Sequence, residues 1–556
     1  MGKKKKNKKA KRAEKVKTRC IPGGFSKNFY WVILILVVLF TASIRIRLLS
    51  IPLERDEGEF AYMGQLILQG IPPYLISYNM KLPGIYAAYA LIMSVFGESA
   101  EGIHLGFLLI NAVTVILVFL LGKRLYDSYT GLIASASFAL LSVSPSVLGT
   151  SAHATHFVLL PALGGILLVV RATDSGRLKH LFYSGILLGI SFLMKQPGLF
   201  FVIFAFLYFL FSLLRTHPFP LRIFMKQGSF FLLGAFFPFV CTVGVLYKAG
   251  VFEKFWFWTY SYAYEYGATI PLSLGLHILL NQISPVVDKF YLLWGMAGFG
   301  ISALFWDKAV RIRVHFVLGF FVFSFLAVCP GLYFRPHYFV LILPAVSLLM
   351  GIGINSLRRL ISKFQPNFRW VATILFLVLL FMGIYSYRSF FFELTPIQAC
   401  RMMYGLNPFP ESIRIAEYIK ARSGKEDKIA ILGSEPQIYF YSNRHSATGY
   451  IYVYSLMENQ KYALRMQLEM ASEIEKVEPK YLVFANIPPS WLANVRSERY
   501  IFEWLREYLE KKFSLVGVVD ILSSDKTEYR WDSEAANYAP RSHYFLCVYQ
   551  NKTVGD

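Results

Sequence analysis

Long apolar blocks separated by short polar turns fill the first 390 residues of the chain. A membrane-spanning helix needs about 20 consecutive, mostly apolar residues. Such blocks begin near residues 29, 102, 130, 155, 181, 198, 228, 288, 314, 337 and 369, and the block at 181–193 is short for a span. We therefore predict a polytopic α-helical membrane protein with eleven spans, or up to thirteen if segments 84–97 and 270–287 cross the membrane rather than lie at its surface.

The distribution of charge orients these spans. Residues 1–28 contain twelve Lys or Arg and a single acid, Glu14. Cytoplasmic loops are enriched in Lys and Arg, and a basic tail beside a span contacts anionic lipid. If this tail is cytoplasmic, every short basic loop falls on its side of the membrane. We predict a multi-pass protein of the inner or plasma membrane with a cytoplasmic N-terminus and no nucleic-acid partner.

Residues 391–556 have a different pattern, with many charges and no long apolar block. Short alternating segments at 429–432, 481–484, 515–519 and 544–548 predict strands, and segments 411–422, 461–476 and 500–512 predict helices. We expect three regions: a basic tail (1–28), a transmembrane domain (29–390) and a soluble extracytoplasmic α/β domain (391–556).

Composition supports a membrane protein, because 55% of the residues are hydrophobic and only 16% are charged. Soluble proteins carry roughly a quarter charged residues. The five cysteines (Cys20, Cys241, Cys329, Cys400, Cys547) stand singly, which argues against a cysteine metal site. The sequence does not decide whether Cys400 and Cys547 form a disulfide, which would require the soluble domain to lie outside the cytoplasm.

The first outer loop, residues 51–101, carries the clearest candidate chemistry. Glu54, Asp56, Glu57 and Glu59 fall within six residues, directly after the first span. Carboxylates beside a bilayer are costly, so they suggest a general base or a metal ligand. The alternative is an acidic helix N-terminus favoured by the helix dipole, and composition leaves both open.

Other outer turns carry cations and imidazoles. Lys81, where the chain re-enters the membrane, is placed to hold a phosphate or to snorkel to the interface. Lys195 lies in an outer turn, against the positive-inside pattern, and Arg335, His337 and Tyr338 together suit an anion.

Two further segments have a functional and a structural interpretation. His153 and His156 share one helical face, which suits a metal pair or interfacial polar packing. The aromatic stretch 252–266, with Trp256 and Trp258, suits stacking on a sugar or isoprene unit, or an interfacial aromatic belt.

Taken together, these segments resemble the GT-C superfamily of polyprenyl-phosphate-sugar-dependent glycosyltransferases. Within it they look like glycosyltransferase family 39, the protein O-mannosyltransferase and lipid A aminoarabinose transferase clan. The motifs that carry the resemblance are Asp56-Glu57 with Tyr62 and Gln65, Lys81-Leu82-Pro83-Gly84, Met194-Lys195-Gln196-Pro197-Gly198, Pro336-His337-Tyr338, and Leu432-Gly433-Ser434-Glu435-Pro436-Gln437.

The resemblance implies a site at the outer membrane surface. Asp56, with Glu57 beside it, would be the catalytic carboxylate, and Lys81 would contact the lipid-linked phosphate, helped by Lys195, Arg335 and Tyr338. Candidate contacts to the sugar or acceptor are Glu59, Tyr62, His153, His156, Trp256, Trp258 and His337. In aminoarabinose transferases a Glu before the turn Lys binds a metal, whereas Met80 stands here. No definite cofactor is implied, and a divalent cation is the remaining candidate.

We therefore expect an enzyme that moves a sugar from a polyprenyl-phosphate donor to a glycolipid, cell-envelope glycan or protein. The charged candidates cluster at one face rather than in mid-membrane, and no internal repeat is evident, so a transporter or flippase of a lipid-linked saccharide is the weaker alternative. A receptor would leave the first-loop acids and Lys81 without a role.

Overall fold

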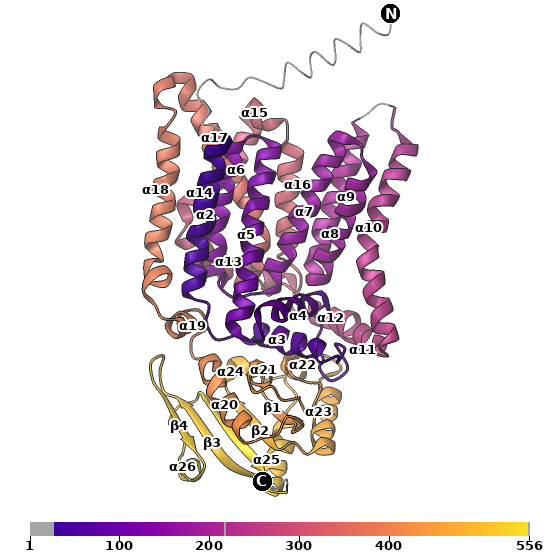
Figure 1. The fold of residues 1–556 in the computed structure, drawn as a ribbon, viewed down its shortest axis with the longest axis vertical. Helices are drawn as coiled ribbons and strands as arrows, with labels where there is room; N and C mark the ends of the chain where they lie inside the picture. The colour runs from indigo at the N-terminus through magenta and orange to yellow at the C-terminus, as the bar shows by residue number, and fades with distance from the viewer. Residues whose placement is uncertain (1–26, 216–217, 554–556) are drawn as a thin grey trace, which may run out of the picture.

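The structure is a computed structural model that describes residues 27–215 and 218–553. A bundle of long helices forms one end of the molecule and a smaller domain with all the described strands forms the other (Figure 1). The predicted basic tail up to residue 26, including Cys20, lies outside the described residues.

Each of the eleven predicted spans coincides with a helix. These are α2 (Lys27–Arg47), α5 (Ala100–Leu125), α6 (Ser128–Val143), α7 (Ala154–Ser175), α8 (Leu178–Met194), α9 (Leu199–Leu214), α10 (Leu221–Lys248), α14 (Tyr291–Trp306), α16 (Val314–Leu326), α17 (Leu343–Phe364) and α18 (Val371–Ser386). Within the described ranges, seven helical stretches are long and apolar enough to cross a membrane, or eight with one bent pair. The helices α6, α8, α14 and α16 are apolar but shorter.

The two segments that the sequence placed either across the membrane or at its surface both form helices. Segment 84–97 is the short helix α4 (Gly84–Phe96), and segment 270–287 is α13 (Leu272–Asp288). A 90° bend separates α13 from the preceding helical run α11 (Phe252–Trp256), η3 (Phe257–Tyr262) and α12 (Ala263–Gly267). That bend leaves the aromatic segment beside the soluble domain.

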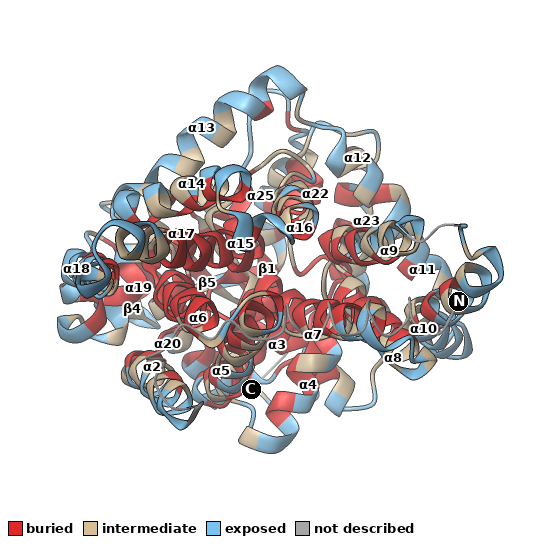
Figure 2. Ribbon diagram, turned by 90° about the horizontal axis from the view of Figure 1, so that it is seen from above, coloured by how far each residue is buried: buried red, intermediate tan, exposed pale blue. Residues whose placement is uncertain are grey.

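Central helices are buried and peripheral helices are exposed (Figure 2). In this view α6, α7 and α17 are mostly buried, whereas α10, α13 and α18 are mostly exposed. Exposed apolar helices are what a bilayer requires, because lipid chains replace water around them. Gly300 of α14 faces Gly353 of α17, and the two backbones leave no space for a side chain at either position. Small residues of this kind let membrane helices approach closely.

The soluble domain contains a five-stranded sheet in the order β1-β2-β5-β3-β4. Its strands are β1 (Ile429–Leu432), β2 (Tyr481–Asn486), β3 (Phe513–Ile521), β4 (Thr527–Trp531) and β5 (Phe545–Asn551). Strands β1 and β2 are parallel, and the remaining pairs are antiparallel. Sequence patterning missed β4, because all five of its residues are half-buried and no alternation marks its faces.

Helices cover this sheet and connect it to the bundle. They are α19 (Pro396–Tyr404), α20 (Phe409–Ala421), α21 (Gln437–Ser442), α22 (Tyr454–Met457), α23 (Ala463–Val477), α24 (Pro488–Trp491), α25 (Tyr500–Lys512) and α26 (Ser533–Ala536). Three of them, α20, α23 and α25, match the predicted helices.

Cys400 and Cys547 do not form a disulfide. Both are free and buried, Cys400 in the core that α19 shares with the bundle and Cys547 in a separate small core beside β3. The Cys400–Cys547 disulfide, which the sequence left open, is therefore not formed.

Candidate functional site

Helix α3 (Arg55–Leu68) begins at the acidic cluster and lies at the junction of bundle and soluble domain (Figure 1). Its first turn is closed by a reciprocal pair of hydrogen bonds: the Glu57 amide donates to Glu54, and the Glu54 amide donates to Glu57. Such a capping box fixes where a helix starts. Two of the four acids therefore have a structural use, and Asp56 and Glu59 point elsewhere.

Asp56 and Lys81 form the centre of the site. The Lys81 ammonium lies 2.9 Å from Oδ1 of Asp56 and 2.6 Å from Oε2 of Glu59. The other oxygen of Glu59 accepts a hydrogen bond from the Tyr86 hydroxyl at 2.9 Å. Burial alone would raise the pKa of Asp56, but the charge and hydrogen bond of Lys81 hold it well below the usual value. Asp56 is therefore ionised and tied to a cation.

Two histidines lie on the other side of Asp56. The rings of His153 and His337 stack with centroids 4.1 Å apart. Oδ2 of Asp56 is 3.9 Å from Nδ1 of His153 and 4.0 Å from Nε2 of His337. One nitrogen from each ring and one Asp56 oxygen lie within 4.8 Å of one another.

This trio suits a divalent cation. Nδ1 of His153 is buried and has no hydrogen-bond partner within the described part of the chain. Burial lowers the pKa of His153 to about 4, so its imidazole is neutral, as metal ligation requires. Two imidazoles and a carboxylate are ligands that Zn²⁺ and related ions accept. Met80 supplies no ligand of this type, and its carbonyl instead accepts a hydrogen bond from Gln196.

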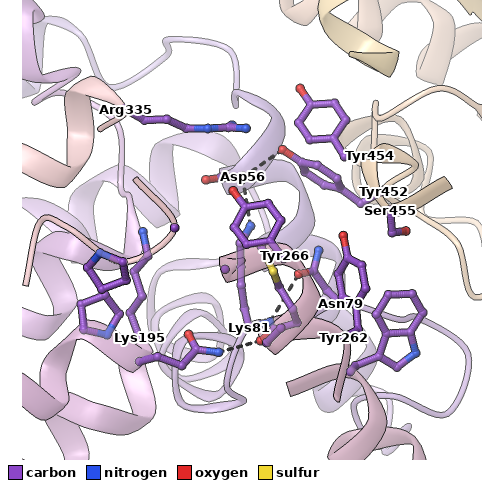
Figure 3. A pocket seen from close by; sticks show the side chains of 18 of the residues that line it. Asp56, Asn79, Lys81, Lys195, Tyr262, Tyr266, Arg335, Tyr452, Tyr454 and Ser455 are labelled. Atoms are coloured by element: carbon purple, nitrogen blue, oxygen red, sulfur yellow. Dashed lines mark hydrogen bonds and ion pairs between the residues drawn. The ribbon is translucent and has the colours of Figure 1, made fainter. Parts of the chain in front are cut away.

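A cavity of about 190 Å³ opens beside Asp56. Lys195 and Arg335 reach it from one side, and Tyr452 and Tyr454 from the other (Figure 3). The Lys195 ammonium lies 4.1 Å from the centre of the Tyr338 ring. Burial lowers the pKa of Lys195 to about 7, because the opposing charge of Asp56 does not compensate and Lys81 and Arg335 lower the pKa further. An anion entering here would meet Lys81, Lys195 and Arg335, which come from three different turns.

A sequence profile described as dolichyl-phosphate-mannose-protein mannosyltransferase matches residues 81–241, which is less than half of the chain. The structure is similar to ArnT from Cupriavidus metallidurans bound to undecaprenyl phosphate, with a TM-score of 0.57, 13% identity, and coverage of 96% of this chain and 100% of ArnT. ArnT from the same organism in the apo state is also similar, with a TM-score of 0.58 and 14% identity over 94% of this chain and 98% of ArnT. The chain has the GT-C fold. No curated protein sequence matches it.

The predicted fold class is thus confirmed, and the profile match agrees with the predicted enzyme class, a membrane glycosyltransferase. The profile begins at Lys81 and ends within α10, so it spans Lys195 and the outer turn before α7 that holds His153.

Six of the predicted site residues do not line the cavity. Two of these, Glu59 and His153, contact residues that do line it, and the other four lie elsewhere. The Glu57 carboxylate is fully buried and pairs with Nε2 of His104 at 3.0 Å. The Tyr62 hydroxyl accepts a hydrogen bond from the Ser446 amide, and His156 packs against Phe107. Trp256 is on the outer surface with 45% of its area exposed. Neighbouring helical residues point about 100° apart, so sequence proximity to Asp56 does not bring Glu57 to the cavity.

Sequence reasoning missed the contribution of the soluble domain. Tyr452, Tyr454 and Glu458 line the same cavity as Asp56, together with Tyr262 and Tyr266 of the aromatic segment. The Tyr452 hydroxyl donates a hydrogen bond to Oδ1 of Asp56 at 3.3 Å. A signal was present in Gly-Tyr-Ile-Tyr-Val-Tyr at 449–454, where tyrosines alternate in a segment that forms no strand.

The soluble domain also holds α3 in place. Arg55, next to Asp56, forms a buried ion pair with Glu435 at 2.7 Å and donates to Asn407. Gly58 lies so close to Gln437 that a Cβ would sit 2.6 Å from its backbone nitrogen. The position of Asp56 therefore depends on contacts made by the turn 434–437.

Replacing Glu435 with Ala should destabilise the protein by about 3–5 kcal/mol, because Arg55 would keep a buried charge without a partner. Denaturant unfolding of the purified full chain in detergent measures this loss. Glu534→Ala, which removes an exposed partner of Arg530, is the control and should change stability by less than about 1 kcal/mol. Equal effects of the two substitutions would contradict the interpretation.

Isothermal titration calorimetry with Zn²⁺ or Mn²⁺ should detect one metal-binding site in the full chain. His337→Ala should lower the metal affinity at least about tenfold, because the substitution removes one ligand from the coordination shell. His277→Ala, at an exposed position, is the control. Metal binding that is unchanged in His337→Ala would exclude this cluster.

Proposed function

We propose that this GT-C protein transfers a sugar from a polyprenyl-phosphate-linked donor to a lipid, glycan or protein acceptor at the extracytoplasmic membrane surface. The observation that carries the proposal is the joint placement of an ionised carboxylate, Asp56, and the cations Lys81, Lys195 and Arg335 around one cavity. The undecaprenyl phosphate bound to the similar ArnT supports a lipid-phosphate ligand.

The cations suit the leaving group. A polyprenyl phosphate leaves as a stable anion, so the reaction needs no general acid. Lys195, Arg335 and Lys81 would stabilise the charge that grows on the phosphate as the glycosidic bond breaks. Arg335 is permanently charged, whereas Lys195, with a pKa of about 7, gains its proton fully once a phosphate lies beside it.

Lys81 links donor binding to the basicity of Asp56. Without an anion in the cavity, Lys81 pairs with Asp56 and Glu59 and keeps the pKa of Asp56 low. A donor phosphate would draw this ammonium toward itself, and the pKa of Asp56 would rise toward its usual value. Asp56 becomes a better base when the donor is present.

In the transfer step Asp56 takes the proton of an acceptor hydroxyl as its oxygen bonds to the anomeric carbon. The bond from that carbon to the phosphate oxygen breaks, and polyprenyl phosphate leaves with the electron pair. Attack opposite the phosphate inverts the anomeric centre. With a phosphate as acceptor, Asp56 would orient it or bind a cation. A divalent ion held by Asp56, His153 and His337 would polarise the oxygen it contacts.

The alternative function, transport of a lipid-linked saccharide, is not favoured, because the profile match over 81–241 is to a transferase family.

Asp56→Asn should reduce transfer by at least about a thousandfold, because the amide cannot accept the proton and no longer attracts Lys81. Mass spectrometry of envelope glycolipids and glycoproteins, in cells with wild-type or variant protein, identifies the product and measures its loss. Asp288→Asn, at an exposed position on α13, is the control and should be fully active. Near-normal product from Asp56→Asn would refute the proposed role.

Cysteine labelling tests the topology, which rests on the basic cytoplasmic loops. In a background with Cys20 and Cys241 replaced by Ala, an impermeant maleimide should label Val495→Cys of the soluble domain in intact spheroplasts, because this position is 98% exposed. Ser175→Cys, at the last residue of α7, should be labelled only after lysis. If Ser175→Cys is labelled in intact spheroplasts and Val495→Cys only after lysis, the topology is the reverse of the proposed one.

A further inference from the structure

The cavity holds a second carboxylate, Glu458, which the transfer mechanism does not use. Glu458 follows α22 in the soluble domain, and its Oε2 accepts a hydrogen bond from the Tyr262 hydroxyl at 2.5 Å. Its Oε1 accepts none from residues 27–215 or 218–553. One oxygen of this half-buried acid is therefore free to meet a ligand.

Glu458 forms no ion pair within the described part of the chain. Lys461, three residues along the chain, instead forms an ion pair with Glu265 of α12 at 2.6 Å. Arg335 lines the same cavity, and its charge acts on Glu458 without a direct ion pair. A carboxylate kept for structure alone would be expected to pair with one of these cations.

The walls around Glu458 are aromatic. Trp258, Tyr262 and Tyr266 come from the loop between α10 and α13, and Tyr454 comes from the soluble domain. The aromatic segment and the soluble domain also contact each other outside the cavity. The ring centroids of Phe257 and Tyr462 lie 5.1 Å apart, and Lys461 forms its ion pair with Glu265. Figure 3 shows Tyr262 and Tyr454 on the same side of the cavity, away from Lys195.

This composition suits a sugar. Aromatic rings cover the apolar C–H face of a pyranose, and a few fixed polar groups then determine its orientation. A carboxylate accepts strong hydrogen bonds from hydroxyl or ammonium groups and repels another carboxylate. Tyr262, the hydrogen-bond partner of Glu458, lies on the side of the cavity away from Lys195 (Figure 3). With the phosphate held beside Lys195, Glu458 would face the remote end of the sugar.

We propose that Glu458 is the residue that selects the transferred sugar, accepting a hydrogen bond from a hydroxyl or amino group of a pyranose stacked between Trp258 and Tyr454 and rejecting a uronic acid. This proposal rests on the proposed function, because it assigns the sugar end of the same donor. Burial raises the pKa of Glu458 to about 7, and a hydrogen bond from the sugar would stabilise the charged form.

Four lipids provide the test with the purified full chain at pH 8, where Glu458 is ionised. They are undecaprenyl phosphate alone and undecaprenyl phosphate linked to mannose, to an amino pentose and to glucuronic acid. Their dissociation constants are measured for wild type, Glu458→Gln, Glu458→Ala and the rim control Glu265→Gln. Melting temperatures within a few degrees of wild type show that each variant is folded.

Wild type should bind the mannose or the amino-pentose donor at least about tenfold more tightly than the glucuronate donor. Glu458→Ala should lose this preference and keep its affinity for undecaprenyl phosphate, and Glu458→Gln should gain affinity for the glucuronate donor. Glu265→Gln should behave as wild type. Whichever neutral or amino donor loses more affinity in Glu458→Gln identifies the group that contacts Glu458.

Two results would overturn the inference in different ways. If wild type binds undecaprenyl phosphate but the Glu458 variants keep the wild-type sugar preference, Glu458 has no selecting role and the proposed function survives. If wild type binds none of the four lipids, the proposed function fails and this inference fails with it.

Discussion

The buried ion pair between Arg55 and Glu435 joins the two halves of the molecule at the point where the site is built. It connects the first turn of α3 to the turn before α21, and Asp56 is the next residue along the helix. Because Arg55 points into the soluble domain and Asp56 into the cavity, any displacement of that domain reaches the carboxylate directly. The aromatic segment and the Tyr452–Tyr454 wall then close the cavity around it.

Charge in the site is divided among separate partners. Glu57 is matched by His104, Glu59 by Lys81 and Tyr86, and Asp56 by Lys81. Lys195 and Arg335 form no ion pair with a carboxylate in the described part of the chain, which leaves them available for an anion. An end of the cavity where the acids of α3 are paired and two cations are not is suited to a phosphate in a medium of low dielectric constant.

The sequence predicted the helices and most strands because long apolar blocks and alternating segments reflect burial directly. Lys81, Lys195 and Arg335 stood out because charges in the predicted outer turns break the pattern of a membrane protein, and the structure brings them to one cavity. Glu458 and Tyr452 had no such contrast, since a Glu or Tyr in a soluble domain is ordinary. Their place in the cavity wall depends on how two distant segments meet. Glu57, Tyr62 and His156 lie away from the cavity, because spacing along a helix does not say which face meets it.

The order of residues along the chain has a consequence for biosynthesis. The helix that carries Asp56 leaves the ribosome early, whereas Glu435 follows Arg55 by 380 residues. Until the soluble domain has been synthesised and docked, Arg55 lacks its partner and the cavity lacks one wall. A nascent or truncated chain that lacks the soluble domain would therefore hold Asp56 without the contacts that position it.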